Sequence, residues 1–182
     1  MTKQTDVDHF GRKPSKGMAA KHYTDDIDDA ADQAIAMQPI GVVHSSYRER
    51  YAAPRQPALD TPEPATIQLN GGMNFDQALQ DLHRFSHIWV IYWMHLNRGW
   101  NPTVMPPRGH KIRRGLLSTR APHRPNSIGL SAVRLTRIEG RILHIEGHDM
   151  LDGTPVLDIK PYLPYADCIT EANNGWLDEA GL

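Results

Sequence analysis

Short segments of alternating apolar and polar residues dominate the chain from Pro39 onward. Alternation with a period of two is typical of strands that bury one face, and glycine or proline between such segments marks turns. Many short strands of this kind predict a mainly β fold, a small closed β-barrel with long loops. The expected strands cover residues 40–44, 65–69, 88–95, 115–120, 132–138, 141–145 and 155–162.

Two local patterns refine this prediction. Asn74-Phe-Asp-Gln77 has the spacing of a helix N-terminal capping box and predicts one short helix that ends near Arg84. Glu139-Gly140 lies between two alternating segments and predicts a tight turn, so that Leu135 faces Ile142 across a hairpin. The barrel is therefore expected to combine a short helix with a tight hairpin.

The first 37 residues lack the strand pattern. They combine few apolar residues with a basic start and an acidic cluster at 25–29. A segment of this composition buries too little apolar surface to form a core. We therefore expect a disordered or arm-like N-terminus over 1–37, a barrel domain over 38–166 and a C-terminal tail over 167–182.

Composition supports one ordinary folded domain. The chain has 182 residues, of which 40% are hydrophobic and 23% are charged, and this length fits a single domain. The longest apolar run, Ile88–Met94, is too short to cross a bilayer, and the N-terminus has no apolar signal core. The single cysteine, Cys168, excludes an intramolecular disulfide and suits a reducing compartment. We expect a cytoplasmic protein with no membrane span.

Charge is segregated along the chain although the net charge is only −1. Residues 98–138 contain nine basic and no acidic side chains, whereas residues 139–182 contain nine acidic and two basic ones. A basic stretch of this kind creates a positive field that suits a phosphate-bearing partner, above all nucleic acid. The alternative is that these basic residues pair in the fold with the acidic C-terminal third.

Several common kinds of active site are missing from the sequence. The chain has no glycine-rich dinucleotide or P-loop motif, which argues against Rossmann and P-loop chemistry. His83 and His87 have the spacing of a helical metal pair but lack the glutamate of that motif, so no metal site is expected. Cys168 stands near acidic residues that disfavour a thiolate, and no serine has the surroundings of a nucleophile.

Three segments carry more polar chemistry than a barrel core requires. Their prolines and glycines stiffen loops that hold long polar side chains, as in a site for a polyanion, a carboxylate, a ribose hydroxyl or an amine. Ordinary surface turns are the alternative. The segments are Pro54–Pro57 with Arg55 and Gln56, Leu116–Leu130 with Arg120, His123, Arg124 and Asn126, and Gly147–Tyr165 with Asp149, Asp152, Lys160 and Tyr162.

Five motifs occur in order along the chain: Pro54–Pro57, Phe85–Trp89, Thr119–Asn126, Ile128–Ser131 and Asp152–Pro164. Together they resemble the TsaA-like (TrmO) family, over nearly the whole stretch from Pro39 to Tyr165. The resemblance implies a compact β-barrel that binds S-adenosylmethionine outside any Rossmann framework and works as a homodimer. It also implies methylation of N6 of threonylcarbamoyl-adenosine at tRNA position 37, in the anticodon loop.

The resemblance also implies site residues at the matching positions. Ser127 replaces the proline usual in this family, and Leu96 stands where a glutamine can occur, so a backbone contact is expected there. No counterpart of the extra C-terminal domain of some longer members is expected. The residues implied for S-adenosylmethionine are Arg55, Gln56, Pro57, His95, Leu96, Arg120, Leu130, Asp149, Met150, Leu151 and Asp152.

The implied reaction, methyl transfer from a sulfonium, needs aligned reacting atoms and a group that accepts the N6 proton. The sequence leaves three candidate acceptors, Asp149, Asp152 and His123. A non-catalytic S-adenosylmethionine or RNA-binding module and a methyltransferase for a small metabolite remain the alternative functions. The residues expected to bind the substrate are Lys111, Arg113, Arg114, Arg124, Lys160 and Tyr162.

Overall fold

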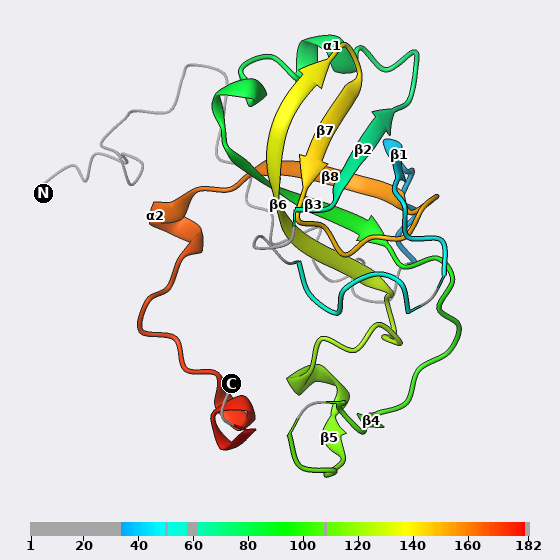
Figure 1. Cartoon of the computed structure of the whole chain (residues 1–182). Coiled ribbons are helices and arrows are strands. Elements are labelled where there is room, and N and C mark those ends of the chain that lie inside the picture. Colours follow the sequence, from blue (N-terminus) through cyan, green and yellow to red (C-terminus); the bar gives the residue numbers. More distant parts are fainter. Residues whose placement is uncertain (1–33, 50, 58–61, 108, 181–182) are drawn as a thin grey trace, which may run out of the picture. The chain divides into compact units, whose positions relative to one another are not determined.

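The structure is a computed structural model that describes residues 34–49, 51–57, 62–107 and 109–180 (Figure 1). The chain divides into two units, and the second, Met37–Leu182, carries the fold. The N-terminal arm expected over 1–37 lies almost entirely outside the described residues. It stays a prediction, as do the boundaries of the barrel domain and of the tail.

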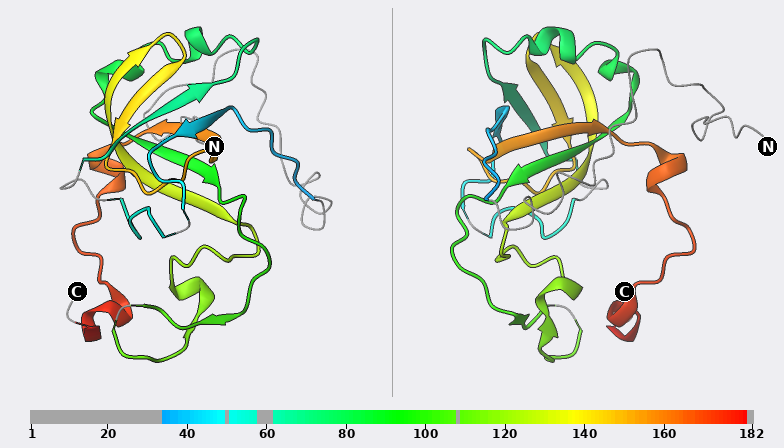
Figure 2. Two further views of the ribbon diagram at one scale, coloured as in Figure 1. Left: turned by 45° about the vertical axis from the view of Figure 1, so that its right-hand side comes forward. Right: turned by 180° about the vertical axis from the view of Figure 1, so that it is seen from behind.

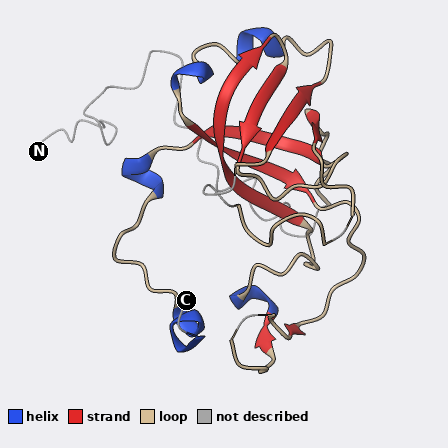
Figure 3. Ribbon diagram, in the orientation of Figure 1, coloured by secondary structure: helices blue, strands red, loops and turns tan. Residues whose placement is uncertain are grey.

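Six strands of the described residues close into an antiparallel barrel (Figure 3). β3 lies between β6 and β8, and β8 pairs back to β1 to complete the closure. The mainly β fold and the closed barrel expected from the alternating pattern are confirmed. In neighbour order the strands are β1 (Gly41–His44), β2 (Pro64–Leu69), β7 (Ile142–Glu146), β6 (Ile128–Glu139), β3 (His87–Trp93) and β8 (Pro155–Pro161).

Alternation fills the barrel interior with aliphatic side chains. On β2, Ala65, Ile67 and Leu69 are buried, whereas Thr66 and Gln68 between them are half-buried. Apolar surface removed from water stabilises the fold by roughly 25 cal/mol per Å². The period-two pattern therefore favours a closed barrel, because closure buries the apolar face of every strand. The most deeply buried apolar side chains are Val43, Ile67, Ile88, Val90, Val133, Leu143, Ile145, Met150 and Val156.

The expected hairpin joins β6 to β7. Gly140 occupies the turn with a φ of 55°, a conformation that glycine adopts without strain. The predicted partner of Leu135 was wrong: Leu135 faces Ile145, and Ile142 faces Glu139. A β-bulge between Leu135 and Arg137 shifts the register, and a bulge leaves no mark in a period-two pattern.

The expected short helix is present but ends earlier than Arg84. α1 spans Phe75–Ala78, and a separate 3-10 turn, η2, spans Leu82–Arg84. Asp81 between them has a φ of 64°, which interrupts the helix. Asn74 donates a hydrogen bond to the Gln77 side chain (2.7 Å) and caps no backbone amide.

The segment 115–120, expected to be a strand, is mostly a turn. A short strand pair, β4 (Thr103–Val104) with β5 (Arg114–Gly115), is followed by the 3-10 turn η3 (Leu116–Ser118). Leu116 is buried and Leu117 is 79% exposed. This difference in burial between neighbouring residues resembles the alternation of a strand, and the segment is too short for its sequence to distinguish a strand from a 3-10 turn.

Two short elements follow the barrel, α2 (Pro164–Asp167) and the 3-10 helix η4 (Gly175–Ala180), and Figure 2 shows their course. Trp89 Nε1 donates to Asp167 Oδ2 at 2.9 Å and fixes α2 against β3. Trp176 Nε1 donates to the Ser118 carbonyl at 2.8 Å and joins η4 to the loop that carries η3. None of the helices in the described part of the chain has the length and apolarity needed to cross a bilayer.

Candidate functional site

Asp149, in the loop between β7 and β8, is the centre of a polar cluster. Ser131 Oγ donates a hydrogen bond of 2.5 Å to Asp149 Oδ1, and the Tyr92 hydroxyl donates to the same oxygen at 3.4 Å. The two hydroxyl oxygens are 3.3 Å apart. Ser131 is 1% exposed and Tyr92 is 7% exposed. The carboxylate is therefore held by partners that are themselves shielded from water.

A glycine on the neighbouring strand makes room for the Tyr92 ring. Gly129 on β6 is the cross-strand partner of Tyr92 on β3. A Cβ atom at position 129 would lie 2.2 Å from two carbons of that ring, far inside the separation of about 3.5–4.0 Å at which carbon atoms pack. The ring therefore lies across the β6 backbone, where its hydroxyl reaches Asp149.

Arg120 joins two polar loops to this cluster. Its Nη1 atom donates a hydrogen bond of 2.8 Å to Gln56 Oε1, and its charge favours the ionised form of Asp149. A hydrogen bond thus joins two of the segments that the sequence singled out, and the charge of Arg120 acts on Asp149 in the third. Arg55 and Pro57 flank Gln56, the former exposed and the latter half-buried.

Burial and hydrogen bonding act on the Asp149 carboxyl in opposite directions. Burial raises its pKa above the usual value for an aspartate, and the Ser131 and Tyr92 hydroxyls and the Arg120 charge offset part of that rise. Burial, and then the charge of Asp149, also raises the pKa of Tyr92, so the phenol stays protonated at neutral pH. A carboxylate with a raised pKa is a better proton acceptor than an ordinary one.

Asp152 lies three residues further on but points to a different place. Its Oδ1 atom accepts the backbone N–H of Ser45 at 3.1 Å, and its own N–H donates to the Tyr47 carbonyl at 2.8 Å. Arg48 and His44 each come within 3.9 Å of its carboxylate. The structure therefore separates the two aspartates that the sequence treated together.

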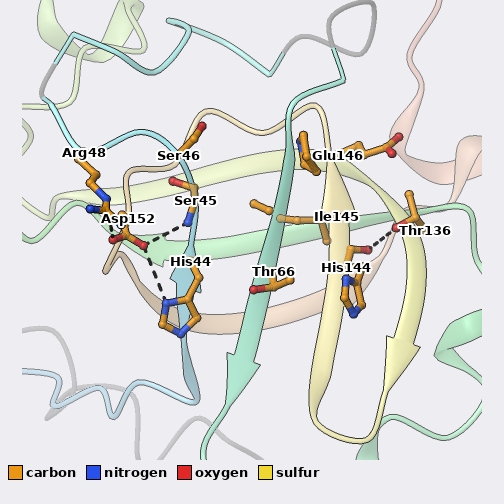
Figure 4. A pocket seen from close by; sticks show the side chains of 12 residues that line it. His44, Ser45, Ser46, Arg48, Thr66, Thr136, His144, Ile145, Glu146 and Asp152 are labelled. Carbon is orange, nitrogen blue, oxygen red and sulfur yellow. Dashed lines mark hydrogen bonds and ion pairs between the residues drawn. The ribbon is translucent and has the colours of Figure 1, made fainter.

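Asp152 belongs to an open groove of about 460 Å³ on the outer side of the barrel (Figure 4). Figure 4 shows Asp152 with His44 and Arg48 on one side and His144 with Thr136 on the other. The groove is formed by residues from β1, β2, β6, β7 and the loop that carries Asp152. Sequence analysis did not anticipate it, because its hydroxyl and imidazole side chains follow the ordinary outward positions of strands.

Between the two aspartates the chain turns inward. The Met150 side chain is 1% exposed and lies in the core, so it is not available to a ligand. Its backbone N–H donates to His148 Nδ1 at 3.2 Å, and its carbonyl accepts the Ser45 hydroxyl at 3.1 Å. Leu151 is half-buried. Met150 thus anchors the loop that displays Asp149 and Asp152 on either side.

His148 is a buried imidazole that the sequence analysis missed. It is 1% exposed, its ring centroid lies 5.0 Å from that of Tyr47, and its Nε2 atom has no hydrogen-bond partner among the described residues. Burial lowers the pKa of His148, against opposing contributions from the Met150 backbone and Glu63. A neutral ring with Nδ1 accepting and Nε2 protonated fits this environment. The flanking Gly147 and the acidic residues around it gave no sign of burial.

Exposed apolar side chains gather on the adjoining ends of β3 and β6. Trp93 and Ile128 are cross-strand partners, 48% and 39% exposed, and Leu130 is 56% exposed. Leu96, just beyond β3, is 66% exposed, and the half-buried His95 packs its ring 6.0 Å from that of Trp93. Three residues implied for S-adenosylmethionine therefore lie on an apolar patch formed by Trp93, Ile128, Leu130, His95 and Leu96.

Only part of the basic stretch is neutralised by acidic residues. Arg114 pairs with Glu179 at 2.9 Å and lies 5.3 Å from the centre of the Trp176 ring, while Arg137 pairs with Glu139 at 3.1 Å. Among the described residues, the expected pairing with the C-terminal third thus involves Arg114 and Arg137. Six other basic residues make no ion pair within the described part of the chain: Arg98, Lys111, Arg113, Arg120, Arg124 and Arg134.

Three residues expected to bind the substrate have partners within the fold, and their role in binding stays a prediction. Arg124 Nη1 donates to the Thr119 carbonyl at 2.9 Å, which stiffens its own loop. Lys160 pairs with Asp158 at 2.7 Å on β8. Tyr162 packs its ring 5.4 Å from that of Trp89. The candidate acceptor His123 is half-buried in the loop between η3 and β6.

Comparison with known proteins identifies the family. A family model described as the tRNA-methyltransferase O N-terminal domain matches residues 42–168, more than half of the chain. The chain belongs to the tRNA-methyltransferase O family. The matched region contains the Asp149 cluster and the groove beside Asp152.

Relatives and solved structures of the tRNA-methyltransferase O family agree with this assignment. The chain is 40% identical over 154 residues to the tRNA (adenine(37)-N6)-methyltransferase of Escherichia coli, which covers 81% of this chain and 66% of the relative. It is 39% identical over 145 residues to a Pyrococcus abyssi protein named a probable S-adenosyl-L-methionine-binding protein, covering 80% and 77%. The crystal structure of TrmO from Pseudomonas aeruginosa superposes with a TM-score of 0.68 at 40% identity, covering 80% of this chain and 64% of that one. The chain thus spans about two thirds of these two bacterial relatives.

Proposed function

We propose that this chain transfers a methyl group from S-adenosylmethionine to N6 of threonylcarbamoyl-adenosine at position 37 of tRNA. The observation that carries the proposal is the Gln56–Arg120–Asp149 cluster, which unites three motif segments from distant parts of the sequence. Membership of the tRNA-methyltransferase O family supports it. So does the name of the Escherichia coli relative, which specifies the same base position.

The side chains of the cluster fit S-adenosylmethionine, which supplies an activated methyl group on a sulfonium. Arg120 and Gln56 offer donors for the cofactor's carboxylate, and the Asp149 carboxylate is an acceptor for an amine or hydroxyl. Leu130 and Leu96, which the resemblance also implies for the cofactor, offer exposed apolar surface. Such a transfer needs positioning and a proton acceptor and no covalent protein intermediate.

The basic side chains without ion-pair partners suit the phosphates of tRNA. Lys111 and Arg113 are exposed in the loop between β4 and β5, and phosphate contacts supply most of the affinity of such complexes. The anticodon loop presents unpaired bases that can be turned out of the stack and inserted into a site. We propose that the chain works as a homodimer in the cytoplasm.

The deciding experiment is methylation of tRNA that either contains or lacks threonylcarbamoyl-adenosine at position 37. Isotopically labelled S-adenosylmethionine supplies the methyl group, and mass spectrometry of the nucleosides locates it. Label on N6 of the modified adenosine, and none on tRNA lacking the modification, is the expected result. Binding of S-adenosylmethionine without turnover would instead identify a non-catalytic module. Turnover that methylates small amines and no RNA would identify an enzyme for a metabolite.

A further inference from the structure

Two residues of the motif Ile128–Ser131 contribute to the Asp149 cluster. Gly129 receives the Tyr92 ring, and Ser131 donates to Asp149. Both face the barrel interior, where a glycine and a serine bury little apolar area compared with the aliphatic residues around them. Their chemistry therefore needs an explanation other than core packing.

We propose that Asp149 accepts the N6 proton during methyl transfer and that Ser131, Tyr92 and Gly129 position its carboxylate for this step. The inference rests on the proposed function. The methyl group moves from sulfur to N6, and the electron pair of the broken carbon–sulfur bond stays on sulfur. The proton that N6 releases passes to the Asp149 carboxylate, so that atoms and charge balance without an oxidant or a metal.

Geometry favours Asp149 over Asp152 as the acceptor. One carboxylate oxygen of Asp152 accepts the backbone N–H of Ser45, and Arg48 and His44 lie beside it. The side chain is 33% exposed. That carboxylate is therefore bound to the loop after β1 and lies apart from the Ser131 and Tyr92 hydroxyls. Asp149 receives its hydrogen bonds from one side, through Oδ1, and lies next to Arg120 of the Gln56–Arg120 pair. In this proposal the proton goes to its second oxygen, since both hydroxyls donate to Oδ1.

The three positioning residues have distinct tasks. Ser131 makes the shorter hydrogen bond and fixes the direction of the carboxylate. Tyr92 makes the longer one and also contacts the Ser131 hydroxyl, so it orients the donor as well as the acceptor. Gly129 contributes by having no side chain, because any Cβ there displaces the Tyr92 ring. Hydrogen bonds to the ionised form lower the pKa of Asp149 against the effect of burial, which keeps the carboxylate available as a base.

The first experiment measures the pH profile of methyl transfer to modified tRNA for the full chain and its variants. Asp149→Asn should reduce kcat by about 10²-fold or more, the usual contribution of a general base. Ser131→Ala should move the acidic limb of kcat to higher pH, because a carboxylate without this donor binds its proton more tightly. Tyr92→Phe should move it the same way by less, since the contact is longer. Two control variants remove a hydroxyl away from Asp149 with little change of side-chain shape: Thr136→Val on β6 and Tyr165→Phe after β8. Both should leave the acidic limb of the kcat profile unchanged.

The second experiment titrates the Asp149 carboxyl by carbon NMR in the same variants, a measurement that requires no turnover. The titration midpoint of Asp149 should rise in Ser131→Ala and, by less, in Tyr92→Phe. At a pH above the midpoints of the parent and of the variant, the affinity for S-adenosylmethionine should be unchanged. An unmoved midpoint in Ser131→Ala would overturn the positioning role. Asp149→Asn with more than a tenth of the parent kcat, or a larger loss in His123→Gln, would overturn Asp149 as the acceptor. A parent protein that binds S-adenosylmethionine but methylates no tRNA would instead overturn the proposed function.

Discussion

Gly129→Ala tests the packing on which the Asp149 cluster depends. The added Cβ would lie 2.2 Å from two Tyr92 ring carbons and 2.7 Å from a third, so the ring must move by roughly 1 Å or more to restore ordinary contact. Tyr92 is 7% exposed in a filled barrel, and overpacking of this kind costs about 1–3 kcal/mol. Loss of the hydroxyl contacts adds about 0.5–1.5 kcal/mol. We expect the free energy of unfolding to fall by about 2–4 kcal/mol.

Urea denaturation of the parent and of Gly129→Ala, followed by tryptophan fluorescence, measures this change. In a Tyr92→Leu background the ring is gone, and Gly129→Ala should be neutral or stabilising, because alanine loses less backbone entropy than glycine in a strand. Gly72→Ala serves as a control for strain alone, since Gly72 has a φ of +82° and open space around its Cβ position. If Gly129→Ala lowered the free energy of unfolding equally in both backgrounds, the conclusion that Gly129 makes room for the Tyr92 ring would be refuted.

Three further predictions concern the ligands and pH. Arg120→Ala should weaken S-adenosylmethionine binding in calorimetry by about ten-fold or more, the effect of a lost charge-assisted hydrogen bond, whereas Arg137→Ala should leave it unchanged. The double variant Lys111→Ala, Arg113→Ala should lower the slope of log tRNA affinity against log salt by up to about two, at roughly 0.7–0.9 per phosphate contact, and an unchanged slope would exclude this loop from the interface. Burial lowers the pKa of His148 below its ordinary value of 6.5, so below that pH the unfolded chain binds a proton that the folded chain does not. Stability should therefore fall as pH drops through 6.5, and His148→Gln should flatten that dependence in thermal denaturation.

Most of the fold could be predicted because each strand of a barrel buries one face, and the resulting alternation of apolar and polar residues is visible in the sequence. β2 was placed to within one residue, and β8 was found along its whole length. The errors fall where local geometry departs from a regular period. The bulge after Leu135 and the left-handed Asp81 depend on tertiary contacts that no local pattern encodes.

The sequence predicted which segments belong to the candidate site but not how their side chains are arranged in space. The loops with Gln56, Arg120 and Asp149 were chosen for their chemistry, and the structure brings these three residues together. Asp152 was grouped with Asp149 because they are close in sequence. The inward turn at Met150 sends them in different directions, and an apolar residue between two aspartates carries no sign of that turn until the core is known.

The charge segregation illustrates a second limit of the sequence. Nine basic residues and nine acidic ones in adjoining stretches suggest mutual neutralisation, but among the described residues only Arg114 and Arg137 of the basic stretch pair with the acidic one. Four of the nine acidic residues of that third belong to β7, β8 and the loop between them, and Arg113 donates instead to the Thr103 hydroxyl on β4. The positive charge therefore stays on the surface, and a net charge near zero does not weaken the argument for a polyanionic partner.

The register between β3 and β6 links the stability of the barrel to the geometry of the site. Ile88 pairs with Val133 and Val90 with Ser131, while Tyr92 pairs with Gly129, and all of these side chains face inward. A shift of either strand by one residue would turn its whole inward set outward and would expose the aliphatic core. A shift of β3 would also remove the Tyr92 hydroxyl from Asp149, and a shift of β6 would remove the Ser131 hydroxyl. The strand register therefore holds the hydrogen-bond geometry of the Asp149 cluster in place, and a substitution that weakens the β3–β6 pairing should disturb this carboxylate before it unfolds the barrel.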